Sequence, residues 1–150
     1  MVGFVDQRET DILDLYLTNV DAPNIGDAAG LQNSAAEGNL YLGLHTGDAL
    51  TDADTAQNSN ETTYTGYARQ AVPRNVTNWT VTGNTGSNDN LIQFGAMTAG
   101  GPVTITDVGF GFAATGAGYL DGFGQVTTDL VVNNTVNPQL AAGAFDLTLD

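Results

Sequence analysis

The sequence of 150 residues contains no cysteine and no lysine, and only three arginines and one histidine. The absence of cysteine excludes a disulfide framework, a thiolate zinc site and a cysteine nucleophile. Because the 17 acidic residues give a formal charge of −14, we expect no nucleic acid and no anionic membrane as partners, since neutralising phosphate requires lysine and arginine. No apolar run approaches the ~18 residues of a membrane-spanning helix.

The acidic residues are mainly aspartates, with 14 Asp against three Glu. Aspartate favours turns and helix caps whereas glutamate favours helix interiors, so the imbalance predicts many loops and little helix. An apolar fraction of 41% is enough for a folded core in a chain of this length. We expect a single β domain over residues 1–150, with an N-terminal helix and arm in 1–38 and a β-sandwich or barrel in 39–150.

The spacing of apolar residues predicts one helix over residues 6–20, with Asp6 as the N-cap and Glu9 in the capping-box position. Its apolar stripe consists of Ile12, Leu13, Tyr16, Leu17 and Val20, with Asp11 and Asp14 off the stripe. Asp21, Pro23 and Gly26 are expected to end the helix. A helix this short must pack its stripe on the rest of the domain or on a neighbouring subunit.

Short strands divided by Gly, Asn and Asp turns are predicted for the rest of the chain. Residues 40–45 and 145–150 alternate between apolar and polar, and 103–112 carries apolar residues on both faces, which indicates a central strand. Further strands are expected over 66–72, 76–81, 91–94, 119–126 and 130–136, with a long exposed loop over 46–65. The pattern predicts a mainly β protein, an antiparallel sandwich or barrel of about seven or eight short strands.

No motif of a catalytic site is present in the sequence. His45 is the only histidine, and none of Ser34, Ser59 or Ser87 lies in a Gly-x-Ser-x-Gly turn. Most carboxylates lie in turn-like contexts, which is not the apolar setting that raises the pKa of a catalytic acid. We therefore expect that the protein is not an enzyme, and a hydrolase is the least supported alternative.

Asp48, Asp52 and Asp54 lie close together in the acidic loop and are the only candidate metal ligands. An EF-hand loop would require glycine at position 57 and glutamate at position 63, where this sequence has Gln57 and Thr63. A looser Ca²⁺ site stays an alternative to a plain acidic surface loop, and no other cofactor is expected.

Arg69 lies in the middle of the predicted strand 66–72 of a strongly anionic chain. Three interpretations are open: a structural ion pair with a carboxylate, a subunit contact, or a ligand contact.

Five segments resemble a widespread group of small virion proteins of tailed bacteriophages. They are Leu40–Asp48, Gly66–Val72, Val103–Phe110, Tyr119–Gly124 and Phe145–Asp150, preceded as in that group by a short helix. Members of the group are usually described as tail-fibre or minor structural proteins, and similar small β proteins decorate capsids. The resemblance implies a virion protein, assembled in the host cytoplasm, and it carries no catalytic residues.

Two virion roles follow from these expectations. The first is a capsid decoration (cement) protein, bound to the major capsid protein or other virion proteins as a homo-oligomer such as a trimer. The alternative is a tail-fibre or baseplate component in host attachment, which would display loops 46–65 and 83–90 with exposed aromatic residues, of which only Tyr64 is there. The predicted interaction residues are Phe4, Ile12, Leu13, Tyr16, Leu17 and Arg69.

Overall fold

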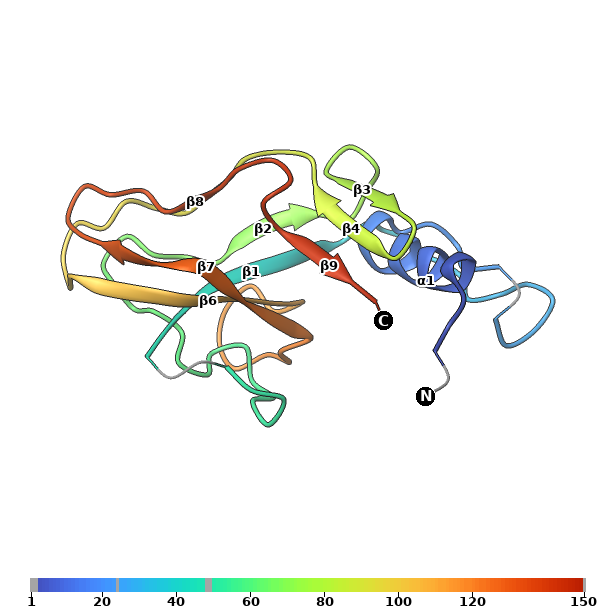
Figure 1. Ribbon diagram of the computed structural model, residues 1–150, viewed down its shortest axis with the longest axis horizontal. Helices are drawn as coiled ribbons and strands as arrows, with labels where there is room; N and C mark the ends of the chain where they lie inside the picture. The colour runs from blue at the N-terminus through green and yellow to red at the C-terminus, as the bar shows by residue number, and fades with distance from the viewer. Residues whose placement is uncertain (1–2, 24, 48–49, 150) are drawn as a thin grey trace. The chain divides into compact units, whose positions relative to one another are not determined.

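The computed structural model describes residues 3–23, 25–47 and 50–149 (Figure 1). Helix α1 (Asp6–Leu13) continues into a π-helical segment, η1 (Asp14–Thr18). Nine strands are found in the described residues: β1 (Asn39–Thr46), β2 (Gln70–Pro73), β3 (Trp79–Thr82), β4 (Thr85–Asn88), β5 (Ile92–Gln93), β6 (Val103–Gly111), β7 (Gly122–Val132), β8 (Gln139–Leu140) and β9 (Asp146–Thr148).

The strands form a four-stranded sheet in the order β2-β1-β6-β7, a three-stranded sheet in the order β3-β4-β9, and the pair β5-β8. The pairs β1–β6, β6–β7, β3–β4 and β4–β9 are antiparallel. No sheet in the described part of the chain closes into a barrel. The mainly β, antiparallel class is therefore confirmed, and the open sheets are consistent with the sandwich-like form rather than the barrel.

The chain forms two compact units, each built from separate segments. Unit 1 comprises residues 1–39, 73–91 and 140–150, and unit 2 comprises residues 40–72 and 92–139. Helix α1 belongs to unit 1 together with β3, β4 and β9, whereas most of the four-stranded sheet belongs to unit 2. The expected single domain over 1–150 stays a prediction.

Apolar side chains from distant segments form the interior of unit 1. Leu17 is fully buried and lies so close to Gly86 of β4 that a Cβ there would overlap it. Trp79 is 1% exposed and meets the ring of Phe145 edge to face, with ring centroids 5.7 Å apart. Arg74 donates hydrogen bonds to the carbonyls of the last helical turn, where a cation is favourable. The helix is thus fixed at its C-terminal end by the same unit.

The helix differs from its prediction at both ends. Val5 is the N-cap and makes no side-chain cap bond, so the predicted cap at Asp6 is wrong: Asp6 is already helical. The helix ends at Thr18 because Asn19 adopts a left-handed conformation (φ 57°), ahead of the expected stop at Asp21. Asp11, expected off the stripe, is buried and pairs with Arg8 at 3.0 Å.

The strand predictions are confirmed in the centre of unit 2 and shifted elsewhere. Leu40, Leu42 and Leu44 are at most 3% exposed on one face of β1, and β6 lies between β1 and β7 as expected. Strand β2 begins only at Gln70, because Gly66 (φ +104°) turns the chain. The strand expected over 76–81 begins at Trp79. The strands expected over 119–126 and 130–136 form one strand, β7.

Candidate functional site

An ion pair between Arg69 and Glu61 lies at the centre of the candidate site in unit 2. The guanidinium donates from Nε and Nη2 to the two carboxylate oxygens at 2.7 Å each, and its side chain is only 2% exposed. Its remaining donors reach the carbonyls of Ala113 and Gly116 at 2.8 and 2.7 Å. Of the three interpretations of Arg69, the structural ion pair is therefore observed. It also clamps segment 113–116 to residue 61.

Two more polar side chains join this pair. The Tyr67 hydroxyl donates to Glu61 Oε1 at 2.7 Å and accepts from the Leu44 amide at 3.0 Å, and burial raises the Tyr67 pKa. His45 is 1% exposed, and its Nδ1 contacts the Ser59 carbonyl at 2.7 Å, so Nδ1 carries the proton. Burial lowers the His45 pKa, which keeps the ring neutral.

His45 faces Asp107 across the β1–β6 register. Asp107 is fully buried, and within the described residues neither its carboxylate oxygens nor His45 Nε2 has a hydrogen-bond partner. The buried polar groups therefore extend from Arg69 along one face of the sheet.

A surface hollow of about 300 Å³ opens beside the ion pair. Its wall comes from Glu61–Tyr64, Tyr67–Arg69 and Ala114–Gly116. Thr62 in this wall is 3% exposed, and within the described residues its hydroxyl has no hydrogen-bond partner. We call this the Arg69 hollow.

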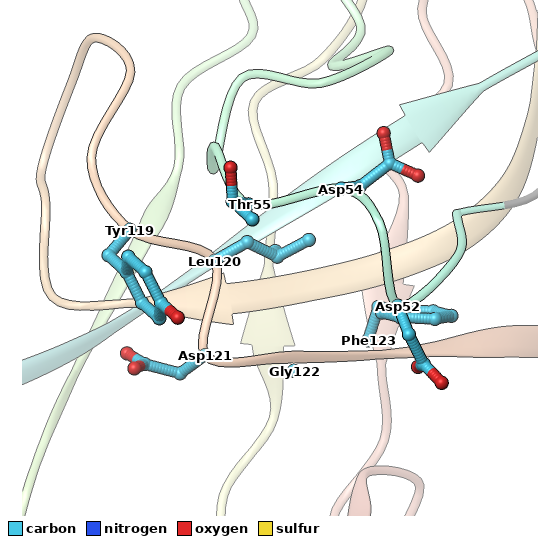
Figure 2. Close-up of a pocket in the computed structure, with 8 residues that line it drawn as sticks. All are labelled: Asp52, Asp54, Thr55, Tyr119, Leu120, Asp121, Gly122 and Phe123. Carbon is cyan, nitrogen blue, oxygen red and sulfur yellow. The ribbon is translucent and has the colours of Figure 1, made fainter.

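A second hollow, of about 380 Å³, lies between loop 46–65 and the start of β7 (Figure 2). Its wall consists of Asp52, Asp54, Thr55, Tyr119, Leu120, Asp121, Gly122 and Phe123. The Leu120 amide donates to the Thr55 carbonyl at 3.0 Å and holds the two segments together. Tyr119 is 68% exposed, so its ring is available at the surface. We call this the Tyr119 hollow.

The acidic loop is less exposed than the sequence predicts. Gln57 is 2% exposed and bridges two segments, donating to the Tyr41 carbonyl and accepting from the Ala113 amide. Leu50 and Tyr64 are also buried, at 4% and 3% exposure, and the Tyr64 hydroxyl donates to the Gly95 carbonyl. The segment is a loop with many exposed residues, as predicted, but these buried residues fasten it at several points.

The candidate calcium ligands do not converge. The carboxylates of Asp52, Asp54 and Asp121 point in different directions in Figure 2. Asp54 accepts hydrogen bonds from the Thr51 amide and hydroxyl, which lower its pKa and give it a role in closing the turn. Asp48 lies outside the described residues, and within them no three acidic or histidine side chains form a metal-binding group.

The structure separates the predicted interaction residues. Leu13 and Leu17 are buried inside unit 1, whereas Ile12 and Tyr16 are partly buried. Arg69 is buried and forms its ion pair with Glu61. Phe4, at 63% exposure, is the only one of the six with a widely exposed side chain. That these residues meet another virion protein stays a prediction.

Sequence reasoning missed Glu61, Gln57, Thr62 and Tyr119. Gln57, Glu61 and Thr62 lie in a polar loop without periodicity, and Tyr119 lies at the start of a predicted strand. Their association depends on long-range contacts such as Arg69 to Gly116. The one available signal was an isolated Arg in an anionic chain, which required a carboxylate partner but did not identify it.

Residues 5–148 match the family model described as podophage GP4 fiber I protein gp80. The chain belongs to this family. The resemblance to small tailed-phage virion proteins is thereby confirmed, and the protein is a structural component of a phage virion. No curated protein matches the sequence. Within the described residues, no helix has the length and apolar character needed to cross a membrane.

Proposed function

We propose that the protein is a tail-fibre or baseplate subunit that contacts the host surface through unit 2. The contact surface consists of loop 46–65 and segment 112–121, which both contribute residues to each of the two hollows. Membership of a family described as a fibre protein supports this role over capsid decoration.

Tyr119 is the observation that carries the proposal. A receptor-binding surface benefits from exposed aromatic rings, because they bury a large area at low entropic cost. The only aromatic residue of the loop is Tyr64, and it is buried. The fold brings the exposed Tyr119 from another segment to the hollow that Asp52, Asp54 and Thr55 of the loop also line. Loop 46–65 therefore has an exposed aromatic partner after all.

The N-terminal helix gives less support to the decoration hypothesis than the sequence did. That hypothesis expected the helix and its flanking N-terminal segment, residues 1–30, to lie on a capsomer or on a neighbouring subunit. Leu13 and Leu17 instead pack inside unit 1, so only the partly buried Ile12 and Tyr16 and the exposed Val20 remain of the stripe for a partner.

The proposed role needs neither catalysis nor a cofactor. We propose other virion proteins and further copies of this chain, with a trimer favoured, as its assembly partners. Its acidic surface then serves to keep particles dispersed and away from nucleic acid.

Copy number and competition test the proposal together. Labelled antibody should mark the tail, with a handful to a few dozen copies per particle, and purified protein should compete with phage adsorption. Tyr119→Ala should abolish competition, whereas Phe4→Ala, which alters an exposed ring in unit 1, should leave it unchanged. Hundreds of copies over the head would instead establish the decoration role.

A further inference from the structure

The ring of His45 lies where three parts of unit 2 meet. It lies above Gly109 of β6, where a Cβ would come within 2.5 Å of His45 Nε2 and 2.9 Å of Leu120 Cδ1. Its Nδ1 donates to the Ser59 carbonyl at 2.7 Å, and the Leu120 amide donates to the Thr55 carbonyl at 3.0 Å. The ring therefore connects the sheet to the acidic loop on one side and to the wall of the Tyr119 hollow on the other.

This arrangement suits only a neutral ring. The Nε2 atom carries no proton, lies in a side chain that is 1% exposed, and has no hydrogen-bond partner among the described residues. Protonation would place a second N–H donor and a positive charge beside the apolar side chain of Leu120. A buried donor without an acceptor is costly, and burial disfavours the charge as well.

The neighbouring charges do not provide an acceptor for a protonated ring in this position. The titratable and charged groups near it come from β6, the acidic loop and the segment before β2, and they are Asp107, Asp54, Glu61, Tyr67 and Arg69. Glu61 Oε1 already accepts from Tyr67 and Arg69, whose own charge repels a protonated ring. Asp107 faces His45 across the register but makes no bond to it in this packing. An Nε2–H group therefore reaches an acceptor only if the packing around the ring rearranges.

We propose that His45 is an acid-sensitive latch on the surface formed by loop 46–65 and segment 112–121. At neutral pH the unprotonated ring fastens both segments to the sheet. At acidic pH, protonation favours an opened form in which the ring separates from Leu120 and water reaches Nε2. The biological meaning of the latch rests on the proposed contact role of this surface, whereas its opening is measured on the isolated protein.

Proton linkage gives the direction and the size of the effect. Burial, assisted by the charge of Arg69, lowers the pKa of His45 in the latched form. In the opened form the solvated ring has the ordinary pKa of about 6.5. The opened form therefore binds the proton first as pH falls. Between pH 7.5 and pH 5.5, one such proton raises the ratio of opened to latched protein by up to about tenfold.

Hydrogen exchange followed by mass spectrometry at these two pH values tests the latch. After correction for intrinsic exchange rates, peptides that cover residues 55–61 and 119–122 should open up to about tenfold more often at pH 5.5. Peptides from β3 and β4 in unit 1 contain no histidine and should change by less than about twofold. The Hε1 signal of the sole histidine should titrate with a pKa below the ordinary value.

His45→Asn separates titration from packing. Asparagine keeps an N–H donor for Ser59 but does not titrate, so opening in this variant should be equal at both pH values, whatever its level. Val76→His in the same background is the matched control. It places a titrating ring at a position of unit 1 that is 70% exposed, and it should not restore the pH response.

Three results would overturn the proposal: a histidine pKa at or above the ordinary value, a pH response that persists in His45→Asn, or an equal response in unit 1. The first and third are measured on the unaltered protein and do not depend on the variant folding. Acid-dependent opening in a protein that does not compete with phage adsorption would count against the contact role and leave the latch standing. Competition by a protein whose exchange ignores pH would do the reverse.

Discussion

Unit 1 and unit 2 hold their interiors together in different ways. In unit 1 the buried Leu17 packs against Gly86 of β4, and the ring of Trp79 meets the ring of Phe145. Unit 2 also buries leucines, but its loops are fastened by the buried pair of Arg69 and Glu61. The two units show apolar packing and a polar network as alternative means of fixing a chain.

The composition of the segments explains the difference. Segment 112–121 and loop 46–65 are rich in Gly, Ala, Thr and Asp, so the burial of Leu50, Tyr64 and Leu120 leaves much of their length to be held by hydrogen bonds. Hydrogen bonds and ion pairs fix such segments in one geometry, as Arg69 does through Glu61, Ala113 and Gly116. This is how a surface of small polar residues acquires hollows of defined shape.

Trp79→Ala should give the largest effect and tests the apolar side of the comparison. Removing a ring that is 1% exposed loses both its burial and its edge contact with Phe145. We expect the free energy of unfolding to fall by about 3–5 kcal/mol, measured by urea denaturation. Val76→Ala, at a position 70% exposed, should change it by less than about 0.5 kcal/mol. Similar losses from the two variants would mean that Trp79 does not anchor a packed core.

Glu61→Gln tests the polar side. The substitution keeps the shape but leaves the Arg69 guanidinium, 2% exposed, without a counter-charge. We expect a loss of about 3 kcal/mol, since removing one partner of a buried pair leaves an uncompensated charge. Glu37→Gln is the matched control, because Glu37 is exposed and its carboxylate accepts a hydrogen bond from the Asn75 side chain, and it should cost less than about 0.5 kcal/mol. Equal losses of unfolding free energy at both positions would show that the pair of Arg69 and Glu61 stabilises the protein no more than a surface ion pair does.

The same comparison explains what the sequence could predict. The alternation of apolar and polar residues predicted strand β1, and apolar residues on both faces predicted the central strand β6. Both predictions succeeded because apolar periodicity follows directly from which faces of a strand are buried. The helix stripe was visible for the same reason, whereas its N-cap was not, because the chain begins the helix at Val5 without a side-chain bond. The polar network could not be predicted, since the partner of Arg69 among 17 acids depends on tertiary structure. Sequence reasoning thus reached the apolar framework and Arg69, but not the residues that surround Arg69.

His45 gives a smaller, pH-dependent contrast, because it is the sole histidine and lies in unit 2. Burial lowers the pKa of His45 below the ordinary 6.5 in the folded state, and the charge of nearby Arg69 lowers it further. The Ser59 hydrogen bond and the charges of Glu61 and Asp107 oppose this shift more weakly. The unfolded chain therefore binds the proton first as pH falls. Stability should drop below about pH 6.5 until the folded pKa is reached, by at most about 1.4 kcal/mol per pH unit.

The measurement is urea denaturation of the protein and of His45→Asn between pH 7 and pH 5.5. Asparagine keeps an N–H donor for the Ser59 carbonyl but does not titrate. The slope should be present in the parent protein and reduced in the variant. Identical slopes would assign the pH dependence to the carboxylates instead.

Calcium removal should have the smallest effect on stability. It tests whether the acidic loop beside the Tyr119 hollow is held by an ion or by hydrogen bonds alone. The Asp54 carboxylate accepts hydrogen bonds from the Thr51 amide and hydroxyl. The carboxylates of Asp52, Asp54 and Asp121 point in different directions. A ligand that binds only the folded state raises stability by mass action, so a genuine calcium site would make the melting temperature depend on free Ca²⁺. We expect the same melting temperature in excess Ca²⁺ and in excess chelator, and the same again for Asp52→Asn, which changes the charge but not the shape. A chelator-sensitive transition that Asp52→Asn removes would show that the acidic loop holds an ion, and that charges in unit 2 fix this loop as well as the segments joined by Arg69 and Glu61.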